Sequence, residues 1–371
     1  MIVDCHHHVF QHWIGPCGHP SREVHAKHVQ KMLTRTVAPV IRQRDGAPAE
    51  TRALFRDGEN GWSGLIDVDL RVGRFGQLEF TVGGEDYVIQ YMPVGMQEFV
   101  APPELMLAQM AYVGVNHCIL QAGGAYGAMT DYNAFVQHQH PDKATGLMWV
   151  DEATAGSPEG LAEVERAHQD LGLRGIYYNL EGFARYDFAW AMDDPRLDPF
   201  WEKLNELGII LCIELSAGPS YDEAGYVMSL RRLGRILNRF PELPCHLAMG
   251  PPVQYFARNG RWEFPDEVTR VYRRDNVLVE VMFPITWGGV WDYPYPEARA
   301  LIRNFRDQFG AEKMMWGSDM PNVERFCTYR QSLDYVRRYC EFLIGREMDL
   351  ILGGNAARLY GLPRSQEHPD G

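Results

Sequence analysis

The sequence lacks the signatures of membrane and secreted proteins. No apolar run reaches the ~20 residues that cross a bilayer, and the longest, such as Gly208–Ile213, fall far short. The chain starts Met-Ile-Val-Asp-Cys-His, with no basic segment, so we expect no signal peptide. The seven cysteines form no CxxC pair and are scattered, several of them in apolar runs. These absences predict a cytoplasmic protein whose thiols are reduced and buried.

Positive charge is also in short supply. The 371 residues include 36 Lys and Arg against 49 Asp and Glu, a formal net charge of −13. Nucleic acids and anionic membranes both select clustered basic residues, so neither is expected among the partners. The hydrophobic share of 46% and the charged share of 23% are those of an ordinary globular chain.

No G-x-G-x-x-G loop follows any strand-like segment, which disfavours an open dinucleotide-binding sheet. Short apolar runs instead alternate with helix-like segments, as parallel βαβ units do. About eight such runs favour an α/β fold of the (β/α)₈ TIM-barrel type. The runs are Ile2–Val3, His117–Leu120, Thr145–Val150, Gly175–Tyr178, Ile209–Leu215, Cys245–Met249, Val277–Met282 and Lys313–Trp316.

Residues 11–104 interrupt this rhythm and predict an insertion after the first strand. Gln77–Val82 and Asp86–Met92 flank Gly83-Gly84, which is the pattern of a β-hairpin. An isolated hairpin is marginal in water, so its apolar face must pack on the barrel or on a second chain, and we expect an oligomer. The chain is therefore predicted to be one barrel over residues 1–362, with a flexible tail at 363–371.

The segment Asp4-Cys5-His6-His7-His8 directly follows the first apolar run. Residues two apart in a strand share a face, so Asp4, His6 and His8 are expected to point one way and His7 the other. Two imidazoles on one strand can converge on a metal ion. A solvated histidine cluster or a tag remnant is the alternative, but the position between an apolar strand and Val9-Phe10 speaks against a tag.

Asp319 ends the last apolar run, in Gly317-Ser318-Asp319-Met320-Pro321. The ends of the first and eighth strands of a barrel are neighbours, so Asp319 can meet His6 and His8. The three side chains predict a divalent metal site, zinc first, with manganese or iron as alternatives. Capping of the next helix by Ser318-Asp319 is a second role that could coexist.

These motifs together resemble the amidohydrolase superfamily, and more narrowly its aminocarboxymuconate-semialdehyde decarboxylase-like branch. The resemblance implies a metal-dependent barrel and covers most of the chain. The segments that carry it are Asp4–His8, Leu171–Tyr178, Gly317–Pro321 and Gly353–Gly361.

Two positions depart from the branch. Ser216 stands where the family places a histidine after strand five, and Ala248 or Met249 stands where it places one after strand six. Such residues neither transfer protons near neutral pH nor bind a hard divalent ion well.

Other polar residues on the same strands could compensate. Glu214 and His246 lie two residues before Ser216 and Ala248, and strand parity places both inside the barrel, one layer deeper. They could be catalytic or reach the metal, or they could form a buried polar pair without a catalytic role, and Glu280 invites the same two interpretations. The insertion's His12, His19, His25 and His28 could approach the barrel mouth, but we interpret each as a surface or loop residue.

Two functions fit this pattern. The first is a mononuclear metal-dependent decarboxylase or hydrolase of a small aromatic or carboxylated compound. The second, which we favour because of the two absent histidines, is a divergent subunit that works with a homologous partner chain. The aminoisobutyrate hydroxylase, an oxygenase made of two unlike chains of this superfamily, is the precedent that the resemblance supplies for a subunit acting on a small carboxylate.

Overall fold

The computed structural model describes residues 1–13, 15–36, 38–50, 55, 57, 61–282 and 288–363. The predicted tail from residue 364 onward lies outside the described residues. Over the described part of the chain, no helix is long and apolar enough to cross a bilayer.

Parallel strands form the centre of the molecule in two sheets, ordered β1-β7-β8 and β15-β14-β11-β10-β9. Single parallel bridges join the sheets at both edges, His7 to Met320 and Met148 to Ile176, and so complete the ring. The predicted α/β barrel is confirmed. Its strands are β1 Val3–His7, β7 His117–Leu120, β8 Ala144–Gly146, β9 Gly175–Asn179, β10 Ile210–Glu214, β11 Cys245–Leu247, β14 Val277–Met282 and β15 Met314–Trp316.

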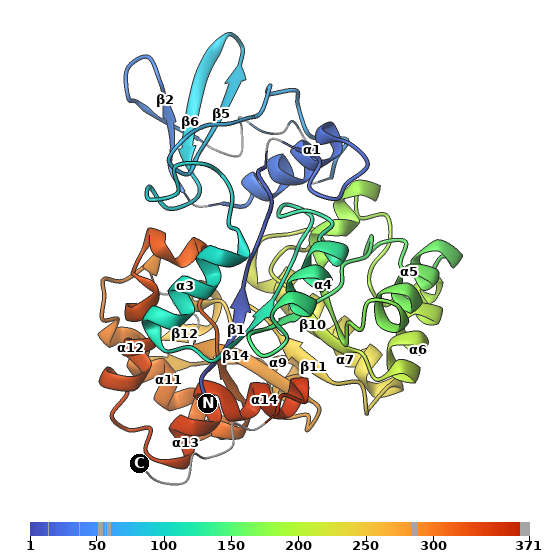
Figure 1. The fold of residues 1–371 in the computed structure, drawn as a ribbon, viewed down its shortest axis with the longest axis vertical. Helices are drawn as coiled ribbons and strands as arrows, with labels where there is room; N and C mark the ends of the chain where they lie inside the picture. The colour runs from blue at the N-terminus through green and yellow to red at the C-terminus, as the bar shows by residue number, and fades with distance from the viewer. Residues whose placement is uncertain are drawn as a thin grey trace.

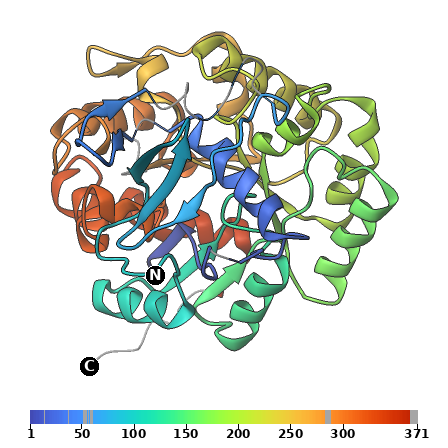
Figure 2. The same ribbon diagram turned by 90° about the horizontal axis from the view of Figure 1, so that it is seen from above.

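Helices surround this ring (Figures 1 and 2). Their apolar faces pack on the outward side chains of the strands in one large core, whereas a smaller core that includes Val3, Cys5 and Cys212 fills the barrel interior. The helices are α3 Pro103–Val113, α4 Thr130–Gln139, α5 Pro158–Gln169, α6 Asp198–Leu207, α7 Glu223–Arg239, α8 Val253–Phe256, α9 Asp266–Tyr272, α11 Pro296–Phe309, α12 Tyr329–Tyr339, α13 Arg346–Asp349 and α14 Asn355–Tyr360.

The insertion lies over one end of the ring (Figures 1 and 2). It contains helix α1 and an antiparallel sheet ordered β3-β2-β6-β5-β4. The predicted hairpin is confirmed as β5 and β6, paired around Gly83-Gly84. The elements are α1 Arg22–Leu33, β2 Val40–Arg42, β3 Pro48–Ala49, β4 Arg71–Val72, β5 Gln77–Val82 and β6 Glu85–Gln90.

The apolar face of the hairpin is covered by its own chain. Leu78, Phe80 and Ile89 are fully buried, in a separate core that also contains Trp13 and Met32. The insertion therefore has its own hydrophobic centre above the barrel mouth.

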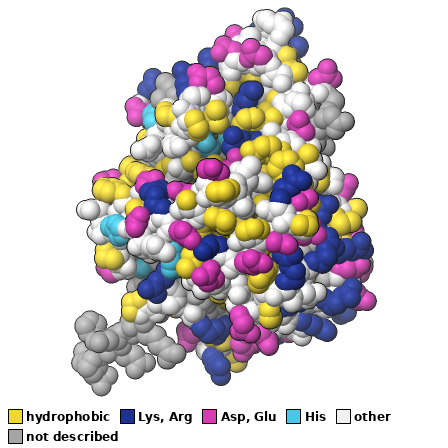
Figure 3. Space-filling model, turned by 90° about the vertical axis from the view of Figure 1, so that its right-hand side faces the viewer, with side chains coloured by type: hydrophobic (Ala, Val, Ile, Leu, Met, Phe, Trp, Pro, Cys, Tyr) yellow, Lys and Arg dark blue, Asp and Glu magenta, His cyan; other side chains and the backbone are white. Residues whose placement is uncertain are grey.

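On the face in Figure 3, acidic and basic side chains are interspersed, so the net negative charge is not gathered in one patch there.

Candidate metal centre and cavity

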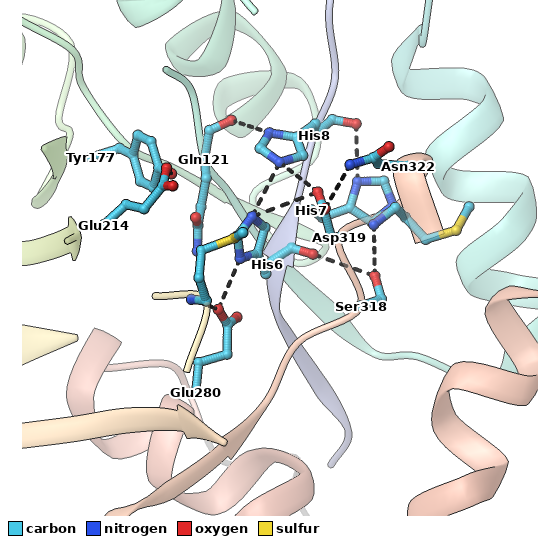
Figure 4. Close-up of polar contacts among 12 residues, drawn as sticks. His6, His7, His8, Gln121, Tyr177, Glu214, Glu280, Ser318, Asp319 and Asn322 are labelled. Atoms are coloured by element: carbon cyan, nitrogen blue, oxygen red, sulfur yellow. Dashed lines mark hydrogen bonds and ion pairs between the residues drawn. The ribbon is translucent and has the colours of Figure 1, made fainter. Parts of the chain in front are cut away.

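The first strand carries an irregularity that decides which of its side chains face the barrel axis. The register of β1 on β7 shifts between Asp4 and His7. Cys5 packs in the inner core of the barrel. His6 and His8 point to the barrel mouth (Figure 4). Asp4, by contrast, contacts Tyr329 of α12. The expectation that Asp4 shares a face with His6 and His8 is therefore wrong, because a bulge resets the alternation of a strand. His7 turns away from the pair, as predicted.

Asp4 instead fixes the end of the eighth strand. Its carboxylate accepts hydrogen bonds from the Ser318 backbone N–H at 2.9 Å, the Ser318 hydroxyl at 2.6 Å and the Tyr329 hydroxyl at 2.8 Å. Ser318 is thus a tether between strands. The next residue, Asp319, has a φ of 62°, in the left-handed region that Asp tolerates better than most residues. This backbone aims the Asp319 side chain at the two histidines.

Three donor atoms converge at the barrel mouth, as predicted (Figure 4). The Nε2 atoms of His6 and His8 are 3.2 Å apart. Asp319 Oδ1 lies 3.0 Å from His8 Nε2 and 3.7 Å from His6 Nε2. All three side chains are buried.

The other nitrogen of each imidazole has its own partner. His6 Nδ1 lies 2.9 Å from the Glu280 carboxylate, and His8 Nδ1 lies 2.9 Å from the Gln121 carbonyl oxygen. Each Nδ1 therefore faces an oxygen acceptor, and each Nε2 is turned toward Asp319. Such partners are typical of metal-bound histidines, whose rings they orient. Tyr126 stacks on the His8 ring at 4.1 Å between centroids and fixes it further.

This donor set fits a divalent cation. The Nε2 atoms of His6 and His8 and the Oδ1 atom of Asp319 face one another inside the protein. The surroundings also favour positive charge. Burial alone would lower the pKa of His6, but Glu280 and Asp319 outweigh it and raise the pKa to about 9. Burial alone would raise the pKa of Asp319, but the two histidines lower it more strongly, so its pKa lies below the ordinary value. Two imidazoles and one carboxylate suit zinc, manganese or iron.

The three donors lie in the wall of a cavity of about 920 Å³ between the barrel mouth and the insertion. Glu214, at the end of β10, lies across this cavity from the histidines (Figure 4). Its carboxylate accepts hydrogen bonds from Arg35 and Ser216, both at 2.6 Å, and from Tyr177 at 2.9 Å and Asn179 at 2.6 Å. These donors occupy about four lone-pair positions, which is the full capacity of a carboxylate.

Arg35 connects the insertion to the barrel. It follows α1 and forms ion pairs with Glu214 at 2.6 Å and Glu181 at 2.9 Å. Burial alone would raise the pKa of Glu214, but the Arg35 charge and the hydroxyl donors hold it below its ordinary value. Glu214 is therefore an ionised anchor for Arg35. Its predicted catalytic role remains a prediction.

His246 lies deeper, as strand parity predicts. It is fully buried in β11, is not among the residues that line the cavity, and its Nδ1 lies 2.8 Å from the Tyr360 hydroxyl. Its Nε2 is 4.0 Å from Glu280. Glu214 and His246 thus have different partners, and the pairing that the sequence allowed is not formed. The catalytic role predicted for His246 also stays a prediction.

Ser216 and Ala248 bring no imidazole to the cavity. Ser216 donates to Glu214, and Ala248 packs in the inner core of the barrel. Met249 lines the cavity, and its backbone N–H donates to Glu280 at 2.6 Å. Neither of these two positions therefore supplies an imidazole to the cavity of the folded protein.

Three histidines of the insertion are buried rather than exposed, so that interpretation is wrong for them. Ser21 caps α1, whose inner face carries His25 and His28. His19 lies 2.8 Å from the Gly124 carbonyl oxygen, and His25 lies 2.9 Å from that of Ala125. They thereby hold the loop after β7 whose Tyr126 stacks on His8. Helical spacing of histidines within an apolar face is the signal that sequence reasoning missed.

His28 belongs to the cavity wall. Its Nε2 is buried and has no hydrogen-bond partner among the described residues, while its ring stacks on His19 at 4.5 Å. Burial, together with the nearby His19 and Arg185, lowers the pKa of His28 well below its ordinary value. The imidazole is therefore neutral near pH 7.

Two further residues of the cavity escaped sequence reasoning. Arg325 has no carboxylate within ion-pair distance among the described residues; it bonds to the Asn322 carbonyl oxygen and packs on Tyr91 and Phe326. Glu152 is buried, and burial raises its pKa well above the ordinary value, which favours its protonated form. No local motif marks either residue, because each depends on its tertiary neighbours.

The amidohydrolase family model matches residues 3–362. The chain belongs to the amidohydrolase family. This is a metal-dependent family that includes decarboxylases and hydrolases of small carboxylated or aromatic compounds. The resemblance seen in the sequence motifs is thereby confirmed.

Individual relatives are more distant. L-Fucono-1,5-lactonase of Burkholderia ambifaria is 26% identical over 228 residues, which are 58% of this chain and 70% of the lactonase. A probable 2-pyrone-4,6-dicarboxylic acid hydrolase of Acinetobacter baumannii shares the fold with a TM-score of 0.53 and 18% identity, over 71% of this amidohydrolase and 90% of that chain.

A dihydroxybenzoic acid decarboxylase of Polaromonas, solved with bound manganese, has a TM-score of 0.51 and 15% identity over 72% of this amidohydrolase and 88% of that chain. None of these likenesses bears on an oxygenase or on a paired chain, so the partner subunit remains a prediction.

Proposed function

We propose that this amidohydrolase is a metal-dependent hydrolase of a small carboxylated ester or lactone. The observation that carries the proposal is the convergence of His6, His8 and Asp319 in the wall of a cavity that also contains Arg325. The named activity of the Burkholderia relative, lactone hydrolysis, is consistent with this reaction class.

His6, His8 and Asp319 would hold the divalent cation, and Glu280 and Gln121 would orient the imidazoles. A cation bound there supplies Lewis acidity that polarises a carbonyl group and makes water more acidic. The remaining requirements are recognition of the substrate and transfer of protons, and the cavity has side chains for both.

Arg325 is suited to bind a carboxylate of the substrate. Its guanidinium lines the cavity, and among the described residues no acidic side chain neutralises it. Arg35, by contrast, is already paired with Glu181 and Glu214. A planar guanidinium binds a carboxylate through two parallel hydrogen bonds, which fixes its position as well as its charge.

His28 and Glu152 are suited to opposite proton transfers. A neutral imidazole with an unpartnered Nε2 can accept the proton of the attacking water. A carboxyl group whose pKa is raised by burial can hold a proton and donate it to the leaving alkoxide. Two groups in one cavity whose pKa values are shifted in opposite directions are a common arrangement for acid–base catalysis.

A substrate screen tests the proposal. Protein reconstituted with zinc, manganese or iron is incubated with carboxylated lactones and esters, and acid release is followed by a pH indicator. We expect metal-dependent hydrolysis, slower by a large factor for the matched neutral lactones. CO₂ release from aromatic acids without any ester or lactone hydrolysis would instead identify a decarboxylase and contradict the proposal.

The pH profile tests the roles of His28 and Glu152. Activity should fall in acid, where His28 is protonated, below its ordinary pKa of 6.5. It should also fall in alkali, above the raised pKa of Glu152. His28→Gln should remove the acid limb and Glu152→Gln the alkaline limb, each with a lower kcat. An unchanged profile in either variant would exclude that residue as the titrating group.

A further inference from the structure

A second group of potential metal ligands lies inside the barrel, beneath the cavity. Cys5 of β1, His246 of β11 and Glu280 of β14 are completely buried. Cys5 Sγ is 3.3 Å and His246 Nε2 is 4.0 Å from Glu280 Oε1, and the three ligand atoms all lie within 4.8 Å of one another. The donors therefore surround one point.

His246 is an independent indication that a ligand binds between these three side chains. Its Nε2 is buried and has no hydrogen-bond partner within the described part of the chain, although Nδ1 lies 2.8 Å from the Tyr360 hydroxyl. When that hydroxyl accepts the Nδ1 proton, Nε2 presents a lone pair toward Glu280 and Cys5. Buried polar atoms in native proteins rarely lack a partner, so we expect His246 Nε2 to have a ligand that binds it.

Glu280 is oriented as a bridging group would be. Its Oε2 accepts hydrogen bonds from His6 Nδ1 at 2.9 Å and from the Met249 N–H at 2.6 Å. Its Oε1 is left facing the interior. A Cβ at Gly317 would come within 2.0 Å of Oε1, so any larger residue at that position would displace the carboxylate.

We propose that Cys5, His246 and Glu280 form a second binding site for a divalent cation, with zinc as the best-suited ion. Donors around a tetrahedral zinc are separated by roughly 3.3–3.8 Å, given zinc–sulfur distances of ~2.3 Å and zinc–nitrogen distances of ~2.0 Å. The contacts of 3.3 and 4.0 Å are close to this spacing. Small shifts of the side chains complete the site.

The chemistry of binding balances without a redox step. The S–H bond of Cys5 breaks, a sulfur–metal bond forms, and the proton leaves to the solvent. One thiolate and one carboxylate neutralise a divalent ion, and His246 adds a neutral ligand. A complex without net charge suits the apolar interior of the barrel, where uncompensated charge is costly. The site shares Glu280 with His6, so the two centres are linked by one carboxylate.

The alternative is a hydrogen-bonded polar core in which the Cys5 thiol donates to Glu280 and no ion binds. Cobalt distinguishes the two states, because a thiolate ligand gives cobalt a charge-transfer band in the near ultraviolet. The three candidate ligands in the cavity, His6, His8 and Asp319, include no thiol. The comparison uses the whole chain and does not depend on the proposed hydrolase activity.

Cobalt is added to the wild type and to a His8→Ala/Asp319→Asn variant, which disables the cavity site only. We expect the thiolate band in both, with one equivalent less cobalt in the double variant. Cys5→Ser should lose the band. Cys118→Ser is the matched control, because Cys118 is also buried but packs outside the barrel against Met106. It should keep the band.

His246→Leu provides a second variant should Cys5→Ser fail to fold, as judged by circular dichroism. It should weaken cobalt binding at the thiolate site by at least tenfold while leaving the cavity site filled. Absence of a thiolate band from the folded, cobalt-loaded wild type would overturn the proposal. So would a band that survives in Cys5→Ser.

Discussion

Glu280 Oε2 lies 2.9 Å from His6 Nδ1, and this contact joins the seventh strand of the barrel to the first. Because the carboxylate accepts, the proton of His6 stays on Nδ1, and Nε2 is left to face His8 and Asp319. The hydrogen bond to Glu280, which lies beneath the cavity, therefore determines which nitrogen of His6 faces the cavity.

His8→Ala should strongly weaken metal binding at the cavity site. The substitution removes one of three donors. The loss of metal affinity should therefore exceed the roughly 10–100-fold loss that follows when a hydrogen-bond partner of a metal ligand is removed. Elemental analysis after dialysis measures the metal content. His7→Gln is the matched control, because His7 is the neighbour of His8 in the chain and equally buried, but its ring contacts Tyr329. Equal metal loss in both variants would exclude His8 as a specific ligand.

Arg325→Ala should raise KM for a carboxylated substrate about 10–100-fold, because hydrogen bonds to charged groups contribute roughly 1.5–3 kcal/mol. The effect on a matched neutral substrate should be small. Arg325→Lys should recover part of the loss, since it restores the charge but not the planar pair of donors. Steady-state kinetics on both substrates provide the measurement, and an equal change in KM for the two would contradict carboxylate recognition.

Arg35→Ala should destabilise the protein by about 3–5 kcal/mol, the range found when one partner of a buried ion pair is removed. The reason is that Glu214 and Glu181 would remain buried without their shared cation. Chemical denaturation gives the change in the free energy of unfolding. Arg42→Ala, which breaks an exposed pair with Asp45, should have little effect. A similar small effect of Arg35→Ala would show that Arg35 is not an anchor.

Acid should weaken the insertion through His19. Burial lowers the pKa of His19 from 6.5 to about 4, so the unfolded chain binds a proton first as the pH falls. The contribution to stability is present above pH 6.5 and is lost between pH 6.5 and about 4, by about 3 kcal/mol in total. His19→Gln should flatten the pH dependence of the unfolding free energy in this window. The same slope in wild type and variant would contradict this assignment.

An oligomer with a homologous partner chain remains a prediction, and exposed apolar residues of the insertion provide its test. Phe75 is 46% exposed and Val94 is 66% exposed, on either side of the β5–β6 hairpin. We expect light scattering to report an oligomer that Phe75→Glu/Val94→Glu dissociates. Ile344→Glu, at a position that is 73% exposed and remote in sequence from the insertion, is the control. A wild-type monomer, alone and co-expressed with a family member, would contradict the prediction.

The sequence by itself determined the barrel, the hairpin and the meeting of His6, His8 and Asp319. Alternating apolar runs and helical segments require parallel βαβ units, and a barrel of such units necessarily brings the end of the first strand beside that of the eighth. His6 and Asp319 could therefore be joined without any knowledge of coordinates. The two positions without a histidine, Ser216 and Ala248, could also be read directly.

Only the tertiary structure decided which way Asp4 points and what surrounds the three candidate metal ligands. A bulge in β1 overrides the simple alternation of a strand, and nothing in five consecutive residues reveals it. The environments of Arg35, His28 and Glu152 likewise depend on segments far apart in the chain. Whether a charge is paired, a proton is held or a nitrogen is left without a partner is a property of distances in space, and strand and helix periodicity do not encode those distances.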